Sequence, residues 1–289
     1  MRAWSAQSWR DVALDSWTEK RKGCVIAGTI LCGLVSYEEP TWGQVGPDEL
    51  RVVLAVSPHF DDVAMGAGLM LIRHEGSRTA VATVFGGTPP AYPDPPSEWD
   101  ALGGFRTGDD IVARRREEDR AAMAVLGADP IWMDFVDHPY LEPADRATPA
   151  DIASALLTVI DSVEPTAVFI PMGLANPDHV AAHEAGLIAR EQRPDIAWFA
   201  YEDQGYKGIP GMLAWRVSKL FRAGLWPSPA LVPVDTDVAR KRKAIWCYTS
   251  QIEPLTREHA LTERMEANVP EQFWRLAPPP RGWEQLPEF

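Results

Sequence analysis

The sequence predicts an α/β fold: a Rossmann-like open, mostly parallel sheet with helices on both faces. Two observations predict it. From residue 51 onward, short apolar runs rich in β-branched and aromatic residues alternate with segments of helical periodicity. Strands that are separated by helices pair in parallel through right-handed crossovers, which is the arrangement of such a sheet. The composition, with 46% hydrophobic and 24% charged residues, is that of a globular protein with a sizeable core.

The apolar runs place five strands along the chain. They are expected at residues 52–56, 80–85, 131–135, 167–170 and 196–201. A helical pattern follows each of the first four, at residues 62–74, 110–127, 149–162 and 178–191, and a further helix is expected near 237–248. Residues 51–289 are therefore predicted to form one main domain.

Residues 1–50 precede the first clear strand and contain four tryptophans. We expect this segment to be an N-terminal extension that packs on the core. Its apolar stretch at residues 24–35 has 12 residues, whereas a helix that crosses a bilayer needs about 20. We therefore expect a buried strand or helix at residues 24–35, no membrane span, and a cytoplasmic protein.

The net charge indicates which partners are expected, and the cysteines indicate the redox compartment. The formal net charge is −13 and the pI is near 4.9, so the surface repels phosphate backbones and no nucleic-acid partner is expected. The three cysteines, Cys24, Cys32 and Cys247, form no C-x-x-C pair and fit a reducing compartment.

Two segments interrupt the alternation of strands and helices. Residues 86–109 are rich in proline and glycine, and a long loop of this kind is commonly a lid or a binding loop. Residues 204–235 mix glycine, proline and aromatic residues. They form either a second wall of a pocket or a variable surface excursion.

The chemistry is concentrated where the first strand ends, at Ser57-Pro58-His59-Phe60-Asp61-Asp62. His59 and Asp62 are three residues apart and can converge on one zinc ion, with one coordination position left for water. Asp61 lies between them and can act as the general base on that water. The structural alternative is that the two aspartates only cap a helix.

A third ligand is expected from another strand end, and His179 is the candidate. It follows the fourth strand in Asn176-Pro177-Asp178-His179, while Asp137, His138, Glu202 and Asp203 follow the third and fifth strands. Ligands of open α/β sheets bind at the carboxyl ends of the strands, so these residues share one rim. His183, one helical turn after His179, is assigned a packing or supporting role.

Dinucleotide binding is excluded by the position of the glycines. Gly66 and Gly68 follow the first strand, but the G-x-G-x-x-G pattern then requires glycine at the position of Leu71. Both glycines also fall inside the predicted helix, too late for a phosphate-binding turn. No Walker motif, G-x-S-x-G elbow or H-E-x-x-H motif occurs.

These motifs resemble those of the PIG-L (LmbE-like) family of zinc-dependent N-acetylglucosaminyl deacetylases. Residues 57–62 are similar to its A-H-P-D-D-E signature, and residues 176–179 to its H-x-D-H motif. The resemblance extends through much of residues 51–255. It implies that the main domain is a PIG-L domain with zinc on His59, Asp62 and His179, that Asp61 is the general base, and that an N-acetyl group is hydrolysed.

The sequence departs from the family pattern at two positions. Val63 replaces the glutamate after the paired aspartates, and Asn176 replaces the first histidine of H-x-D-H. Asn176 can donate a hydrogen bond to an oxyanion but cannot supply a proton. The acid is then expected to be Asp61, returning its proton, or His138.

Three residues are candidates for substrate contacts. Arg115 falls on an apolar helical stripe with Glu118, where a charged pair is either a buried ion pair or points into the pocket; Glu118 is assigned a structural role. Asp137 either binds sugar hydroxyls or caps a turn. Trp99 can stack on a sugar or an aglycone.

Three functions are compatible with these residues. The first is a zinc-dependent N-deacetylase of an N-acetylglucosamine-like sugar or glycoside in secondary metabolism, with a small N-acetylated molecule as its substrate. The second is a zinc amidase for another amide, such as a thiol conjugate. The third is a non-catalytic binding protein, which the presence of Asp61 argues against. Iron or cobalt can occupy a site of this kind in place of zinc.

Overall fold

The computed structural model describes residues 43–72, 77–266 and 270–278. The chain divides at residue 40 into two units, and every described residue belongs to the second. The four N-terminal tryptophans and the apolar stretch at 24–35 therefore lie outside the described residues. Of the predicted N-terminal extension, Val45 is buried in the core of the main body, and Gln44 forms a β-bridge with Leu231.

A seven-stranded sheet forms the centre of the described unit, and it confirms the predicted α/β class. Its strands are β1 (Val52–Ser57), β2 (Arg78–Thr83), β3 (Asp129–Trp132), β4 (Ala167–Pro171), β5 (Ala197–Tyr201), β6 (Trp226–Ala230) and β7 (Phe273–Ala277). They lie in the order β3-β2-β1-β4-β5-β7-β6. The first five are parallel to one another, whereas β7 is antiparallel to both β5 and β6.

The two strands at the β6 side of the sheet were not predicted. Pro227 and Pro229 break the pattern that predicts a strand in β6, because proline removes a backbone donor. β6 is the outermost strand of the sheet, where one side of the strand needs no ladder bonds, so both prolines are accommodated.

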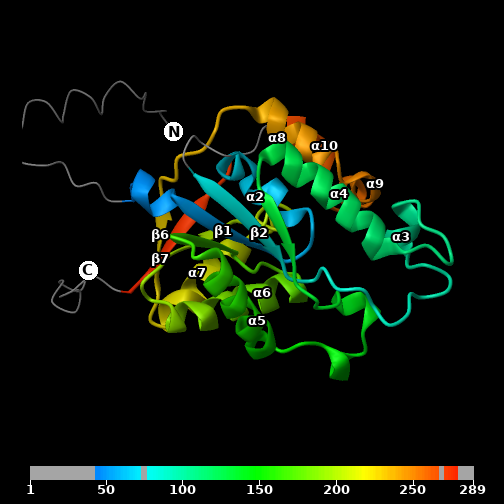
Figure 1. The fold of residues 1–289 in the computed structure, drawn as a ribbon, viewed down its shortest axis with the longest axis horizontal. Helices are drawn as coiled ribbons and strands as arrows, with labels where there is room; N and C mark the ends of the chain where they lie inside the picture. Colours follow the sequence, from blue (N-terminus) through cyan, green and yellow to red (C-terminus); the bar gives the residue numbers. More distant parts are fainter. Residues whose placement is uncertain (1–42, 73–76, 267–269, 279–289) are drawn as a thin grey trace, which may run out of the picture. The chain divides into compact units, whose positions relative to one another are not determined.

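Helices cover both faces of the sheet (Figure 1). On one side lie α2 (Asp62–Leu71), α4 (Ile111–Leu126) and α8 (Val238–Ile245), and on the other α5 (Pro149–Val163), α6 (Pro177–Gln192) and α7 (Met212–Arg222). The described residues also form α3 (Glu98–Leu102), α9 (Thr249–His259) and α10 (Leu261–Glu266), and 3-10 helices at Pro47–Leu50, His138–Tyr140 and Pro143–Asp145.

Alternate residues of each strand enter different cores. In β1, Val53 and Ala55 belong to the core on the α2 side, and Leu54 and Val56 to the core on the α5 side. Side chains of a strand point to opposite faces in turn, so a strand that is covered on both sides is apolar throughout. This accounts for the continuous apolar runs in the sequence.

Local sequence signals place the ends of the helices. Thr148 caps α5 by accepting the backbone N–H of Asp151, whose side chain accepts the N–H of Thr148 in return. Asp110 caps α4 by accepting the N–H of Ala113. The same helix ends at Gly127, whose φ of 81° is the left-handed conformation that glycine adopts without strain.

The glycines of α2 serve packing. A Cβ on Gly66 would lie 2.7 Å from the ring of Tyr201 on β5. The helix is also kinked at Ala67, where φ is −143° and ψ is 22°. Gly66 therefore allows a close approach of the helix to the sheet, and Gly68 faces the side chain of Lys241 in α8. No helix of the described residues is long and apolar enough to cross a membrane.

A substitution at Gly186 tests how closely α6 packs on the sheet. A Cβ there would lie 2.6 Å from Cγ2 of Ile170, which is fully buried in β4. Alanine in a helix is normally more stable than glycine by about 1 kcal/mol. Overpacking costs about 1–3 kcal/mol, so we expect Gly186→Ala to destabilise the protein by about 1 kcal/mol. Urea unfolding followed by circular dichroism measures the change.

Glu191→Ala, at an exposed position of the same helix, is the control. We expect its free energy of unfolding to stay within about 0.5 kcal/mol of the wild type. A Gly186→Ala variant as stable as this control would contradict the close packing of α6 on β4.

Candidate active site

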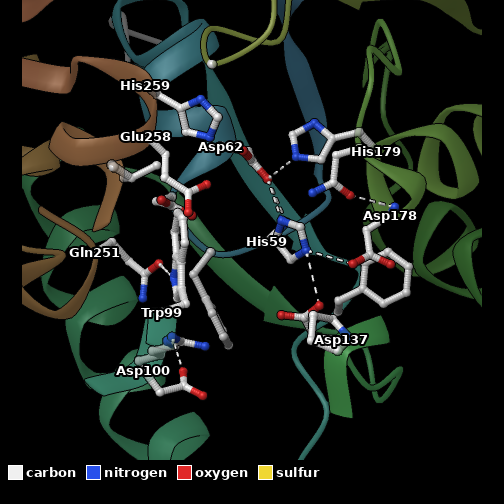
Figure 2. A pocket seen from close by; sticks show the side chains of 18 of the residues that line it. His59, Asp62, Trp99, Asp100, Asp137, Asp178, His179, Gln251, Glu258 and His259 are labelled. Atoms are coloured by element: carbon white, nitrogen blue, oxygen red, sulfur yellow. Dashed lines mark hydrogen bonds and ion pairs between the residues drawn. The ribbon is translucent and has the colours of Figure 1, made fainter. Parts of the chain in front are cut away.

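A cavity of about 270 Å³ opens at the carboxyl ends of the parallel strands (Figure 2). The residues that follow β1, β4 and β5 line one side of it, including His59, Asp62, His179 and Tyr206. Residues from α3 and α9 line another side. The cavity is therefore built from segments that are up to about 200 residues apart in the sequence.

The turn between β1 and α2 holds the first motif in place. The hydroxyl of Ser57 accepts the N–H of Val63 and donates to the backbone oxygen of His59. The carboxylate of Asp62 accepts the backbone N–H of His59 at 2.9 Å. These bonds fold residues 57–63 into a compact turn, which brings the side chains of His59 and Asp62 to the same point.

Asp62 lies at the centre of the predicted metal site. One of its carboxylate oxygens is 3.1 Å from Nδ1 of His59 and 3.2 Å from Nε2 of His179. Ligand atoms of the three residues all lie within 4.8 Å of one another, so they can share one ion. The structure therefore brings together the three residues that the sequence suggests as metal ligands.

The opposite nitrogen of each histidine faces another carboxylate. Nδ1 of His179 lies 2.6 Å from Asp203, and Nε2 of His59 lies 3.1 Å from Asp178. A histidine that binds a metal commonly has a carboxylate on its second nitrogen, which orients the ring and makes it a stronger ligand. The surroundings of His59 and His179 thus fit a divalent metal.

A second group of possible ligands overlaps the first. His59, Asp137 and Asp178 also offer atoms within 4.8 Å of one another, but through Nε2 of His59 rather than Nδ1. Only the first group contains two imidazole nitrogens with a carboxylate, the donor set that suits zinc. We assign the metal to the first group and treat Asp178 and Asp137 as partners of His59.

The electrostatics of the site favour a bound cation. Burial would lower the pKa of His179, but Asp62 and Asp203 raise it to about 9. Burial would likewise lower the pKa of His59, yet Asp137, Asp178 and Asp62 raise it well above the usual value. Each imidazole is therefore held by carboxylates that stabilise positive charge, and a divalent ion can supply that charge in place of protons.

Asp61 is buried, and its side chain makes no hydrogen bond or ion pair with another residue within the part of the chain that the structure describes. It stands at the N-cap position of α2, but its side chain makes no capping hydrogen bond, so the helix-cap alternative does not apply. It lines the cavity next to Asp62. Burial, and then the charge of Asp62, raises the pKa of Asp61 to about 7. A carboxylate with a pKa in this range can both accept and return a proton near neutral pH.

Asn176 forms the N-cap of α6 and also lines the cavity. Its Oδ1 accepts the backbone N–H of Asp178 at 2.8 Å, and its Nδ2 donates to the hydroxyl of Tyr206 at 3.2 Å. The amide therefore has a structural role in the helix cap and a polar contact with a cavity residue.

His138, the alternative acid, lies behind Asp178. Its Nδ1 is 2.7 Å from the carboxylate oxygen of Asp178 that does not face His59. His138 is not among the described residues that line the cavity, although its neighbours Asp137 and Pro139 are. The structure thus gives His138 access to Asp178 and not to the cavity.

The three predicted substrate contacts all line the cavity. Arg115 is buried and pairs with Asp100 at 2.8 Å. Asp137 lies 3.6 Å from His59, and its side chain caps no helix. Trp99 donates its indole N–H to Gln251 at 3.0 Å, which fixes the ring at the wall.

Glu118 lies apart from this group. Its carboxylate accepts hydrogen bonds from the side chain of Thr249 and from the backbone N–H and side chain of Ser250. It anchors the start of α9, which agrees with the structural role expected from the sequence.

The long loops and α9 supply a cavity wall that the sequence did not fully reveal. Residues 86–109 contribute Trp99 and Asp100, and residues 204–235 contribute Tyr206. α9 presents four residues spaced along one helical face: Gln251, Leu255, Glu258 and His259. Figure 2 shows Gln251 and Glu258 across the cavity from Asp178 and His179. The helical spacing of the four residues was the only available signal.

Residues 54–190 match the family model of GlcNAc-PI de-N-acetylase, PIG-L. This chain contains a PIG-L domain. The match begins in β1 and ends in α6, so it includes both motifs of the candidate metal site. The predicted family is confirmed, and the PIG-L domain carries His59, Asp61, Asp62 and His179.

Solved structures share the fold over most of the chain. The A40926 pseudoaglycone deacetylase is 26% identical, with a TM-score of 0.63, covering 79% of this chain and 98% of that one. The zinc-inhibited form of a teicoplanin deacetylase is 23% identical, with a TM-score of 0.64, covering 80% and 100%. A teicoplanin deacetylase in complex with teicoplanin is 24% identical, with a TM-score of 0.63, covering 79% and 99%.

His183 provides a test of the buried polar groups beneath the site. Its Nδ1 donates to the backbone oxygen of Pro171 at 2.8 Å, and its buried Nε2 has no partner among the described residues. Burial, and then the charge of Arg216, lowers its pKa to about 3. Between about pH 6.5 and 3 the unfolded chain binds a proton here that the folded chain does not, so stability is lost as pH falls.

We expect His183→Asn, which keeps a donor for Pro171, to reduce this pH dependence. Between pH 5 and 6 the free energy of unfolding should fall less steeply than in the wild type, by about 1 kcal/mol per pH unit. Denaturant unfolding at a series of pH values measures both slopes. Identical slopes in the two proteins would show that His183 is not buried as a neutral imidazole.

Proposed function

We propose that this protein is a zinc-dependent N-deacetylase that removes an N-acetyl group from an N-acetylglucosamine-like sugar of a glycoside. The observation that carries the proposal is the group of His59, Asp62 and His179, with the buried carboxylate of Asp61 beside it, inside a PIG-L domain. A metal with an open coordination position and an adjacent base is the arrangement that hydrolyses amides.

The chain's own residues would hold the metal through two imidazoles and one carboxylate. Zinc suits this donor set, and a bound zinc ion supplies a water of lowered pKa and polarises a carbonyl oxygen. Asp203 and Asp178 fix the orientation of the two imidazoles from behind. The geometry required for water activation thus depends on five side chains from three strand ends.

Asp61 then carries the proton through the reaction. It removes a proton from the attacking water while it is ionised, and it gives the same proton to the departing nitrogen when the amide bond breaks. The products are acetate and a free amine. This cycle needs no histidine at position 176, because the carboxyl group that accepts the proton also returns it.

The sugar is proposed to lie between the metal site and the wall of α3 and α9. Asp137 and the Arg115–Asp100 pair offer acceptors and donors for hydroxyl groups, and Trp99 offers an aromatic face. Similarity to the A40926 pseudoaglycone deacetylase, at 26% identity, supports a glycosylated secondary metabolite as the substrate.

Two other functions are separated from this one by experiment. An amidase for a thiol conjugate would use the same residues but reject N-acetylated amino sugars. A binding protein without activity has no need for a buried carboxylate without a structural partner, so Asp61 argues against it. The predicted cytoplasmic location stays a prediction.

The metal site predicts the effect of removing one ligand. We expect purified wild-type protein to contain about one zinc ion per chain, and His179→Ala to lose both the metal and the activity. His259→Ala, which removes a cavity histidine outside the metal group, should keep its zinc. Elemental analysis by mass spectrometry measures the content. Wild-type protein that stays metal-free after zinc is added would contradict the proposal.

The proposed role of Asp61 predicts that its replacement reduces catalysis and leaves the zinc content unchanged. Asp61→Asn preserves the shape of the side chain but cannot take a proton from water. We expect kcat for acetate release to fall by about 10² to 10⁴-fold, the usual contribution of a general base, with zinc content unchanged. N-acetylglucosamine glycosides are the test substrates. An Asp61→Asn variant as active as the wild type would exclude the assigned role.

A further inference from the structure

Tyr206 follows β5 and is held at the edge of the proposed metal site. Its ring packs edge-on against His179, with centroids 5.1 Å apart and ring planes at 89°. A second edge-on contact joins it to His259, with centroids 5.0 Å apart. Its backbone N–H donates to the backbone oxygen of Asp203, and the carboxylate of the same residue orients His179. The ring is therefore fixed between a proposed metal ligand and α9.

The hydroxyl oxygen of Tyr206 acts as an acceptor. Asn176 uses its Oδ1 to accept the N–H of Asp178, so the group that it turns toward Tyr206 is the NH₂. The amide orientation is thus set by the helix cap and needs no assumption about the amide flip. A hydroxyl that accepts one hydrogen bond keeps its own hydrogen for a different partner.

The hydrogen of this hydroxyl has no acceptor in the part of the chain that the structure describes. Tyr206 and Asn176 both line the cavity, next to His179. Tyr140, the other tyrosine of the cavity wall, differs in this respect. Its hydroxyl donates to the carboxylate of Asp100, with its oxygen 2.9 Å and 3.0 Å from the two carboxylate oxygens. Tyr206 is thus the cavity tyrosine with a hydrogen left to donate.

We propose that Tyr206 is a catalytic residue whose hydroxyl donates a hydrogen bond to the carbonyl oxygen of the scissile amide as that oxygen becomes negative. This proposal rests on the proposed function. No proton changes hands at Tyr206, because the phenol keeps its hydrogen and the bond strengthens as charge develops. A donor that is fixed in place before the reaction stabilises the transition state without reorganisation.

The same geometry gives Asn176 a defined role. It cannot act as an acid, but it orients the hydroxyl of Tyr206 by donating to its oxygen. Asn176 is a positioning residue in this arrangement, and Tyr206 makes the contact with the reacting oxygen. The departure from the H-x-D-H motif is then compensated by a residue from the neighbouring strand end.

Two single variants and their combination test the proposal. Tyr206→Phe keeps both ring contacts and removes only the hydroxyl. We expect kcat to fall by about 10²-fold with KM changed less than about threefold, because the bond forms in the transition state. A tetrahedral phosphonate analogue of the substrate should bind Tyr206→Phe more weakly by a similar factor, measured by calorimetry. Zinc content and thermal stability are measured alongside and should match the wild type.

Asn176→Asp reverses the hydrogen bond to Tyr206. Aspartate caps a helix as well as asparagine does, but its second oxygen has no hydrogen to donate and instead accepts the hydroxyl hydrogen of Tyr206. We expect kcat to fall about as far as in Tyr206→Phe, because the donor is turned away from the substrate. The kcat of the double variant should lie within about threefold of the kcat of the less active single variant.

The possible outcomes separate this proposal from the proposed function. A Tyr206→Phe variant within threefold of wild-type kcat overturns the role of Tyr206. A double variant whose loss is the product of the two single losses overturns the orienting role of Asn176. Zinc-loaded wild type that neither releases acetate from N-acetylglucosamine glycosides nor binds the phosphonate analogue overturns both the proposed function and this inference. Active wild type with the expected losses supports both.

Discussion

The carboxylate of Asp62 contacts imidazoles from two strand ends, and the site depends on this arrangement. His59 follows β1 and His179 lies in the first turn of the helix that follows β4. β1 and β4 are adjacent and parallel, with Val53, Leu54 and Ala55 paired to residues 167–169. The register of this pair therefore sets the distance between the two histidines. Both faces of β1 are buried, and a shift by one residue would move every side chain to the opposite core, so packing on both faces holds the register.

Four carboxylates lie close to the ring nitrogens of this pair of histidines, with Asp62 between the two rings. Asp203 and Asp178 face the outer nitrogens, and Asp137 lies near the second of these contacts. Negative charge in a partly buried site is costly unless a cation balances it. A divalent ion held by His59, Asp62 and His179, as proposed, would balance this charge. Among the described residues, the carboxylate of Asp61 makes no ion pair with a histidine of the site.

The side-chain amide of Asn176 makes two different contacts, one through its oxygen and one through its nitrogen. Where an acid would offer a proton, this chain has an amide whose oxygen is used by the cap of α6. The remaining amide hydrogens face Tyr206, which comes from the loop after β5. Because α6 and this loop both begin at the carboxyl edge of the sheet, a change in one motif can be compensated by a residue that is 30 positions away.

The sequence by itself predicted the parallel sheet with its first five strands, the family, and the three residues proposed as metal ligands. Alternation of apolar runs with helical periodicity is a local property, and His59, Asp62 and His179 lie in short motifs at predicted strand ends. The sequence left open whether Asp61 only caps a helix. In the structure its side chain makes no capping hydrogen bond.

Only the tertiary structure decided which residues face the cavity from a distance. Neither β6 nor β7 was predicted from the sequence. β6 contains two prolines, and at the edge of the sheet it pairs with β7. The wall of α9 and the contact of Asn176 with Tyr206 join segments that no local pattern relates. Such contacts depend on how helices and loops pack across the sheet, and this packing follows from long-range burial rather than from the residues next to each position in the chain.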